Sequence, residues 1–110
     1  MLEIPCTVAT PARIPFIGTT ITLFSDRALD LLMRFLRHRG FLSIELHAID
    51  MMDADSDGFP SLAPFQPDAA VPLATKSRRI RKALRRIVHD FGFEPMTLRR
   101  AAEILRGNSR

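Results

Sequence analysis

Residues 41–50, Phe-Leu-Ser-Ile-Glu-Leu-His-Ala-Ile-Asp, carry the strongest strand pattern in the chain. Apolar residues recur along this stretch and neither glycine nor proline interrupts it, which is typical of a strand in a sheet. Residues 51–75 follow and contain four prolines, a density that excludes regular structure throughout. We therefore predict a central strand over 41–50 and a long loop after it.

Upstream of this strand the pattern is helical and then extended. Apolar residues at helical spacing predict a helix over 26–39, with Ser25 or Asp26 as its cap. Residues 2–8 alternate in polarity and indicate a strand. Residues 16–23 are rich in threonine and β-branched side chains, which favours either a strand or an extended loop.

Downstream of the loop the chain returns to helical spacing. The pattern predicts a helix over 76–91 with Gly92 at its end. A short strand at 93–96 and a helix over 98–105 follow, and we expect residues 106–110 to form a frayed tail.

The order of these elements indicates the fold class. Strands that alternate with helices are typical of parallel βα units. Three strands are few for a parallel sheet, which needs both faces covered. We therefore expect α/β architecture, with about three parallel strands and three helices, in which residues 1–110 form a single partial domain of a larger sheet or barrel.

Composition narrows the class of protein. The chain has 110 residues, 46% of them hydrophobic, and no apolar run long enough to span a membrane. The first residues, Met-Leu-Glu-Ile-Pro-Cys, do not resemble a secretory signal. The single cysteine, Cys6, cannot form an internal disulfide, so we expect a cytoplasmic protein in which Cys6 is a small buried hydrophobic residue.

Charge is unevenly distributed along the chain. The formal net charge is +4, yet seven of the eleven residues at 76–86 are Lys or Arg. One interpretation is a helix that contacts the phosphates of a nucleic acid. The other is a solvated outer face of a helix whose apolar stripe packs on the protein, and the intact stripe favours this second interpretation.

His47 is the first candidate for chemistry. It lies near the end of the predicted central strand, where active sites of parallel α/β folds are built, and a histidine there can act as general acid or base. Asp50, three residues later, could orient it or a metal ion. The alternative is a strand-end histidine bonded to backbone, with Asp50 beginning a turn.

The remaining candidates are weaker. Residues 53–58, Asp-Ala-Asp-Ser-Asp-Gly, match the opening of an EF-hand loop, but Pro64 stands where that loop needs a bidentate Glu, so an acidic solvated loop is favoured. Arg13, beside proline in a loop, could clamp a carboxylate. His38 and His89 lie on predicted helices and are expected at the surface.

Taken together, several short motifs resemble the C-terminal part of a polysaccharide deacetylase of the NodB-homology type. The matching stretches are Leu2–Val8, Arg13–Phe16 with the following Gly-Thr-Thr, Ile44–His47, and Gly92–Leu98. The resemblance spans about residues 2–105. It implies a distorted (β/α) barrel that removes acetyl groups from N-acetylated sugars, with a divalent metal such as zinc that polarises the amide.

The resemblance also implies roles for two residues. His47 matches the histidine that protonates the leaving amine, and Arg13 matches the arginine that orients the catalytic Asp. The family's T-F-D-D segment and its H-x-x-x-[HD] pair, which supply the base and the metal ligands, have no counterpart here. We therefore expect no metal or other cofactor in this chain, no activity from it alone, and either a second chain that supplies the missing part or self-association.

Two functions of other classes remain open. One is a small basic module that binds nucleic acid through the helix at 76–91. The other is an interaction or structural piece without chemistry.

Overall fold

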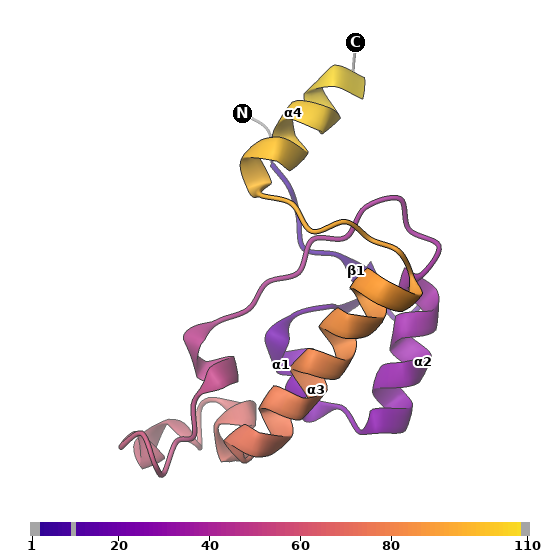
Figure 1. Ribbon diagram of the computed structural model, residues 1–110. Helices are drawn as coiled ribbons and strands as arrows, with labels where there is room; N and C mark the ends of the chain where they lie inside the picture. The colour runs from indigo at the N-terminus through magenta and orange to yellow at the C-terminus, as the bar shows by residue number, and fades with distance from the viewer. Residues whose placement is uncertain (1–2, 10, 109–110) are drawn as a thin grey trace.

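The computed structural model describes residues 3–9 and 11–108, and it is dominated by helices. Helices α1 (Gly18–Leu23), α2 (Asp26–Leu36) and α3 (Leu73–Arg85) lie together, and α4 (Leu98–Asn108) extends away from them (Figure 1). The radius of gyration is 15.4 Å and the extents are 50 × 31 × 25 Å. A compact domain of this length has a radius of about 13 Å, so the molecule is elongated.

The predicted α/β fold is wrong. In the described ranges the sheet has two strands, β1 (Val8–Ala9) and β2 (Ile14–Pro15), which pair antiparallel with Val8 opposite Pro15. A single parallel bridge joins Ile17 to Glu45. One bridge does not make a parallel sheet, so the chain is not a three-stranded portion of a (β/α) barrel.

The predicted strand at 41–50 is replaced by an extended segment and a turn. Residues 43–45 are extended, and their backbone bonds Thr7 and Gly18. A 3-10 turn, η1 (Ala48–Met51), then begins directly after His47. The alternation of apolar residues correctly indicated extension, but Asp50 bonds back to His47 and ends it.

The predicted strand or extended loop at 16–23 is also wrong, because α1 occupies most of it. Its threonine hydroxyls donate back to backbone carbonyls, Thr20 to Pro15 at 2.7 Å and Thr22 to Thr19 at 3.1 Å. These local bonds and the burial of Ile21 outweigh the strand preference of β-branched residues.

The helices after the first follow the sequence pattern more closely. Ser25 caps α2, its hydroxyl accepting the backbone N–H of Ala28 at 3.3 Å, as predicted. Helix α3 begins at Leu73, three residues before the predicted start, and continues as a π-helical turn, η4 (Arg86–Asp90). Gly92 has a φ of 74°, which suits a helix end.

The C-terminal region differs from the prediction in two places. The expected strand at 93–96 is irregular and joins no strand of the described chain. Thr97 caps α4 as predicted, with its hydroxyl accepting the N–H of Arg100 at 3.3 Å. Helix α4 runs on to Asn108, so part of the expected frayed tail is helical, and residues 109–110 lie outside the described chain, as does the predicted strand's first residue, Leu2.

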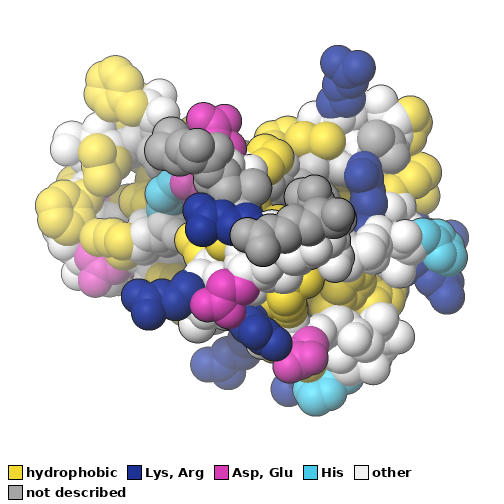
Figure 2. All heavy atoms as spheres, turned by 90° about the horizontal axis from the view of Figure 1, so that it is seen from above, with side chains coloured by type: hydrophobic (Ala, Val, Ile, Leu, Met, Phe, Trp, Pro, Cys, Tyr) yellow, Lys and Arg dark blue, Asp and Glu magenta, His cyan; other side chains and the backbone are white. Residues whose placement is uncertain are grey.

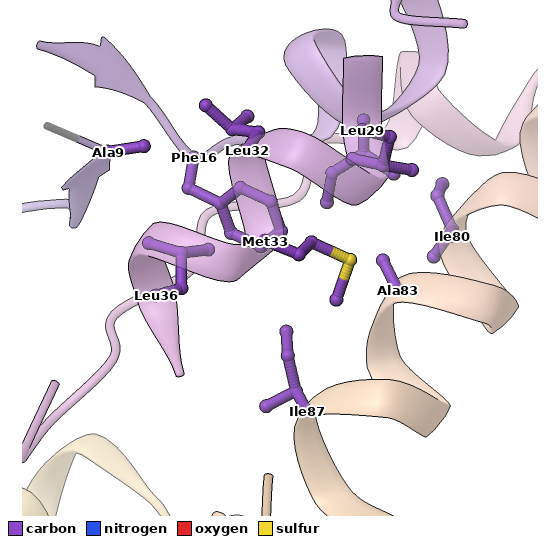
Figure 3. Close-up of a cluster of buried hydrophobic side chains, with 10 residues drawn as sticks. Ala9, Phe16, Leu29, Leu32, Met33, Leu36, Ile80, Ala83 and Ile87 are labelled. Carbon is purple, nitrogen blue, oxygen red and sulfur yellow. The ribbon is translucent and has the colours of Figure 1, made fainter. Parts of the chain in front are cut away.

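The hydrophobic core lies between α2 and α3. Met33 of α2 points between Ile80 and Ala83 of α3 and Ile87 of η4, and Phe16 closes the cluster on the side of the strands (Figure 3). Phe16, Leu29, Met33 and Leu36 are fully buried. Most of the apolar stripe predicted on α2 and on α3 with η4 packs in this core, whereas Phe35 and Leu84 of the predicted stripes are exposed.

Much apolar surface remains outside this core. Hydrophobic side chains lie among charged ones on the face seen in Figure 2. Leu98 is 70% exposed and Phe65 84% exposed. No described helix is both long enough and apolar enough to cross a membrane.

Candidate functional site

His47 lies at the junction between the extended segment and η1, with its imidazole exposed. Nε2 lies 3.2 Å from Oε1 of Glu45. The two residues are separated by two positions on an extended backbone, so their side chains fall on the same side. A carboxylate at this distance can accept a hydrogen bond from the ring and orient it.

The backbone of His47 is held by Asp50. The N–H of His47 donates to Oδ2 of Asp50 at 2.7 Å, and the N–H of Asp50 donates back to the carbonyl of His47 at 3.0 Å. The side chain of Asp50 is fully buried. The exposed imidazole therefore belongs to a turn whose backbone is fixed by a buried carboxyl group.

Gly18, the first residue of α1, makes room for the Asp50 carboxyl. A Cβ atom at position 18 would overlap that carboxyl group, with Oδ1 at 2.7 Å and Oδ2 nearer still. The N–H of Gly18 also donates to the carbonyl of Glu45 at 2.8 Å. The absence of a side chain thus lets α1 approach the turn that carries His47.

Lys76 of α3 supports the same turn from the other side. Its ammonium donates to the carbonyls of Ile49 and Met52, each at 3.0 Å, and the side chain is fully buried. From the sequence, Lys76 was expected to face phosphate or solvent together with the other basic residues at 76–86. In the structure it is buried and faces neither.

Asp68 completes this buried polar cluster, which comprises Thr22, Asp50, Asp68 and Lys76. It lies in a 3-10 turn, η3 (Pro67–Ala70), and its Oδ1 accepts the side-chain amide of Gln66 at 2.6 Å. Oδ2 lies 3.4 Å from the hydroxyl of Thr22. The cluster joins α1, η1, η3 and α3, which are far apart in sequence.

Burial shapes the electrostatics of this cluster. Desolvation raises the pKa of Asp50, and the neighbouring Asp68 raises it further, whereas the bond from the His47 backbone acts in the opposite direction. A carboxyl group next to another carboxyl group in a dry site tends to retain its proton.

Arg13 does not join this site. It lies in the turn between β1 and β2, exposed, with a φ of 53°. It precedes the bridge residue Ile17 by four positions, whereas His47 follows the bridge partner Glu45 by two. Arg13 and His47 therefore lie on opposite sides of this bridge along the two segments.

Cys6 lies near Glu45 but is poorly suited to nucleophilic chemistry. Its Sγ is 3.8 Å from Oε2 of Glu45, and the thiol is half-buried. Burial raises the pKa of the Cys6 thiol, and the charge of Glu45 raises it further. A thiol of this kind stays protonated near neutral pH.

The acidic loop at 53–58 folds on itself. Oδ1 of Asp53 accepts the N–H groups of Asp55 and Ser56, and Oδ2 of Asp57 accepts the N–H of Asp53 at 2.8 Å. These backbone bonds, led by that of Ser56, lower the pKa of Asp53. Across residues 3–9 and 11–108 no three His, Cys, Asp or Glu side chains are arranged to hold a metal ion.

Most of the basic side chains at 76–86, on α3 and the start of η4, are paired within the protein. Arg78 lies 2.9 Å from Asp26, and Lys82 and Arg86 both contact Asp30 of α2. Arg79 donates to the carbonyl of Thr22. Arg81 and Arg85 are left without a partner in the described chain, so less positive charge is available to nucleic acid than the sequence suggests.

Glu45, Gly18, Asp68 and Lys76 were not predicted as parts of the site. The spacing of Glu45 and His47 could have revealed their contact, because alternate residues of an extended segment share a face. Nothing local in the sequence distinguishes Lys76 from the other bases of its helix.

Comparisons with protein-family models, curated proteins and solved structures find no match to this chain. The geometry of the His47 turn is therefore the main evidence on function.

Proposed function

We propose that the chain supplies His47 as a proton-transferring group to a carbohydrate deacetylase whose base and metal reside outside the residues that the structure describes. The observation that carries this proposal is the position of His47. Its imidazole is exposed, while its backbone is bonded to a buried carboxyl group.

The chemistry of histidine suits such a role. An imidazole can give up and regain a proton near neutral pH, and it protonates a leaving amine when it is held within hydrogen-bond reach. Glu45 at 3.2 Å limits the orientations of the ring. Burial of Asp50, Asp68 and Lys76 costs stability. A requirement that His47 be held in a fixed position would account for this cost.

The metal that the resemblance implies does not fit the described residues. They contain no group of three suitable ligands, so the role proposed for His47 is proton transfer alone. Arg13 precedes the bridge residue Ile17, whereas His47 follows its partner Glu45, and no described contact joins Arg13 to the turn that carries His47. If Arg13 has a role, it contacts another part of the substrate or partner.

The proposed substrate is an N-acetylated carbohydrate, and the proposed partner is a second polypeptide segment that carries the base and metal ligands. Several large apolar side chains, among them Phe65 and Leu98, are exposed and are available for contact with such a partner. The proposed compartment is the cytoplasm, where a lone thiol stays reduced.

Acetate release tests this proposal. N-acetylglucosamine oligomers and zinc are supplied to the chain alone and to its complex with the polypeptide that co-purifies from its native host. We expect release from the complex only, and a loss of about 10²–10⁴-fold with His47→Ala.

His38→Ala and His89→Ala are the matched controls, because both histidines are exposed and lie away from the turn. Both variants should release acetate as fast as the wild type. Equal rates for His47→Ala and wild type would show that His47 is not the proton donor, and no release from any preparation would contradict the deacetylase assignment.

A further inference from the structure

The buried carboxyl of Asp50 has one oxygen without a hydrogen-bond donor. Oδ2 accepts the N–H of His47, but Oδ1 is buried and has no donor in the described chain. An acceptor left bare in the interior costs about 1–3 kcal/mol, and more when it is charged. An ionised Asp68 has no hydrogen to donate to Oδ1. A proton retained on one of the two carboxyl groups would supply the missing donor.

The carboxyl group of Asp68 also has too few hydrogen-bond donors. Its Oδ1 receives the Gln66 amide, whereas Oδ2 depends on the hydroxyl of Thr22 at 3.4 Å. That hydroxyl has one hydrogen and lies closer, at 3.1 Å, to the carbonyl of Thr19. When Thr22 donates within its own helix, Oδ2 of Asp68 is also without a donor.

The charges of the cluster point in the same direction. Asp50, Asp68 and Lys76 are each fully buried. Two carboxylates and one ammonium carry a net charge of −1, and a buried net charge is costly. One retained proton makes the cluster neutral and supplies the missing hydrogen bond.

We propose that Asp50 and Asp68 share one proton near neutral pH, and that this shared proton ties the turn carrying His47 to α1 and η3. Asp50 is thereby a positioning residue for His47. The shared proton is argued from the burial of both carboxyl groups, the Oδ1 atom of Asp50 that has no donor, and the side-chain interaction between Asp50 and Asp68. Its importance for catalysis rests on the proposed function.

The other ionisable groups near the pair are few. Lys76 approaches from α3 and His47 lies in the turn itself, while α1 contributes Gly18 and Thr22, neither of which titrates. Asp53 follows the turn, is partly exposed and bonded to backbone N–H groups, and its charge interacts with that of Lys76. The raised pKa of Asp50, caused first by burial and then by Asp68, agrees with a retained proton.

Carbon-13 NMR of the aspartate side-chain carboxyl carbons tests the proposal in the full chain. The reference is the ordinary pKa of an aspartate, about 3.9. We expect one carboxyl of the pair to lose its proton well above this value, and the amide signal of His47 to shift with the same midpoint. Titration of both carboxyls at or below the ordinary value would overturn the proposal, as would a His47 amide that does not follow the pair.

Asp68→Asn supplies the matched variant. The asparagine amide can donate to Asp50 without a titrating proton, and the cluster is then neutral with Asp50 ionised. We expect the titration of Asp50 at high pH to disappear while the amide signal of His47 stays unchanged. If Asp50 still titrated at high pH in this variant, the proposal of a shared proton would be overturned. An Asp68→Asn variant that does not fold leaves the wild-type titration to decide. Acetate release by His47→Ala bears on the proposed function alone, so the two failures are distinguishable.

Discussion

The backbone N–H of His47 and the Oδ2 atom of Asp50 lie 2.7 Å apart, and this bond links an exposed imidazole to a fully buried carboxyl group. Three distant elements converge on the turn that contains Asp50. Gly18 leaves space for it, Asp68 lies beside it, and Lys76 bonds the carbonyls of the same turn. The position of His47 thus depends on tertiary packing as well as on its local bonds with Asp50.

Gly18→Ala should destabilise the protein by about 1–3 kcal/mol, because the added methyl group overlaps the carboxyl of Asp50 and the core must shift to accept it. Urea unfolding measures the change. Gly40→Ala is the control, since a Cβ there meets nothing within 4 Å, and it should be neutral or slightly stabilising. Equal effects of the two substitutions would contradict the close approach.

Lys76→Met should lower the free energy of unfolding by at least about 2 kcal/mol. Methionine keeps the apolar stem but removes two charge-assisted bonds to buried carbonyls. Arg81→Met on the same helix is the comparison, because Arg81 is exposed and has no described partner. It should stay within about 0.5 kcal/mol of wild type. A Lys76→Met protein as stable as Arg81→Met would show that the ammonium is not buried in this way.

Met33→Ala should cost about 2–5 kcal/mol, since it opens a cavity between α2 and α3 at the centre of the core (Figure 3). Leu31→Ala lies two residues away on the exposed side of α2, at 57% exposure, and should change stability by about 0.5 kcal/mol or less. Chemical denaturation compares them. The reverse order would mean that α2 packs through another face.

The stability of the wild type relative to Asp50→Asn should fall as the pH rises above the usual pKa of an aspartate, about 3.9. The folded state holds the shared proton more tightly than the unfolded chain does, because the pKa of Asp50 is raised. The contribution of this proton to the free energy of unfolding is complete below the pKa of Asp50 in the unfolded chain. It is lost as the pH rises through the higher pKa of Asp50 in the folded protein. Unfolding of Asp50→Asn measured across the same pH range should lack this decline, and an unchanged decline would assign it to other groups.

The packing helices were well predicted from the sequence. The apolar stripe of α2, its Ser25 cap and the Gly92 end of the third helix all depend on local spacing and local bonds, which a sequence displays directly. Met33 and Ile80 fall on buried faces for the same reason.

The strands could not be predicted in this way. Threonines at 19, 20 and 22 favour a strand by propensity, yet two of their hydroxyls bond backbone carbonyls and Ile21 is buried in α1. Residues 43–45 are extended, but a sheet also needs partners, and none of the described segments provides a long one. Pairing is a property of distant segments rather than of the strand itself.

The candidate site was found in part. His47 and Asp50 were visible as polar residues at the end of an apolar segment. Lys76 was assigned to a charged surface, because burial of one lysine among seven basic residues depends on the carbonyls of a turn far away in sequence.

Hydrogen exchange of the His47 amide tests the central claim most directly. The neighbouring amide of Leu46 has no described partner and serves as the internal reference. If Asp50 holds His47 from within the core, the His47 amide exchanges much more slowly than that of Leu46. Equal exchange rates for the two amides would show that the turn is not anchored and that the account of His47 is wrong.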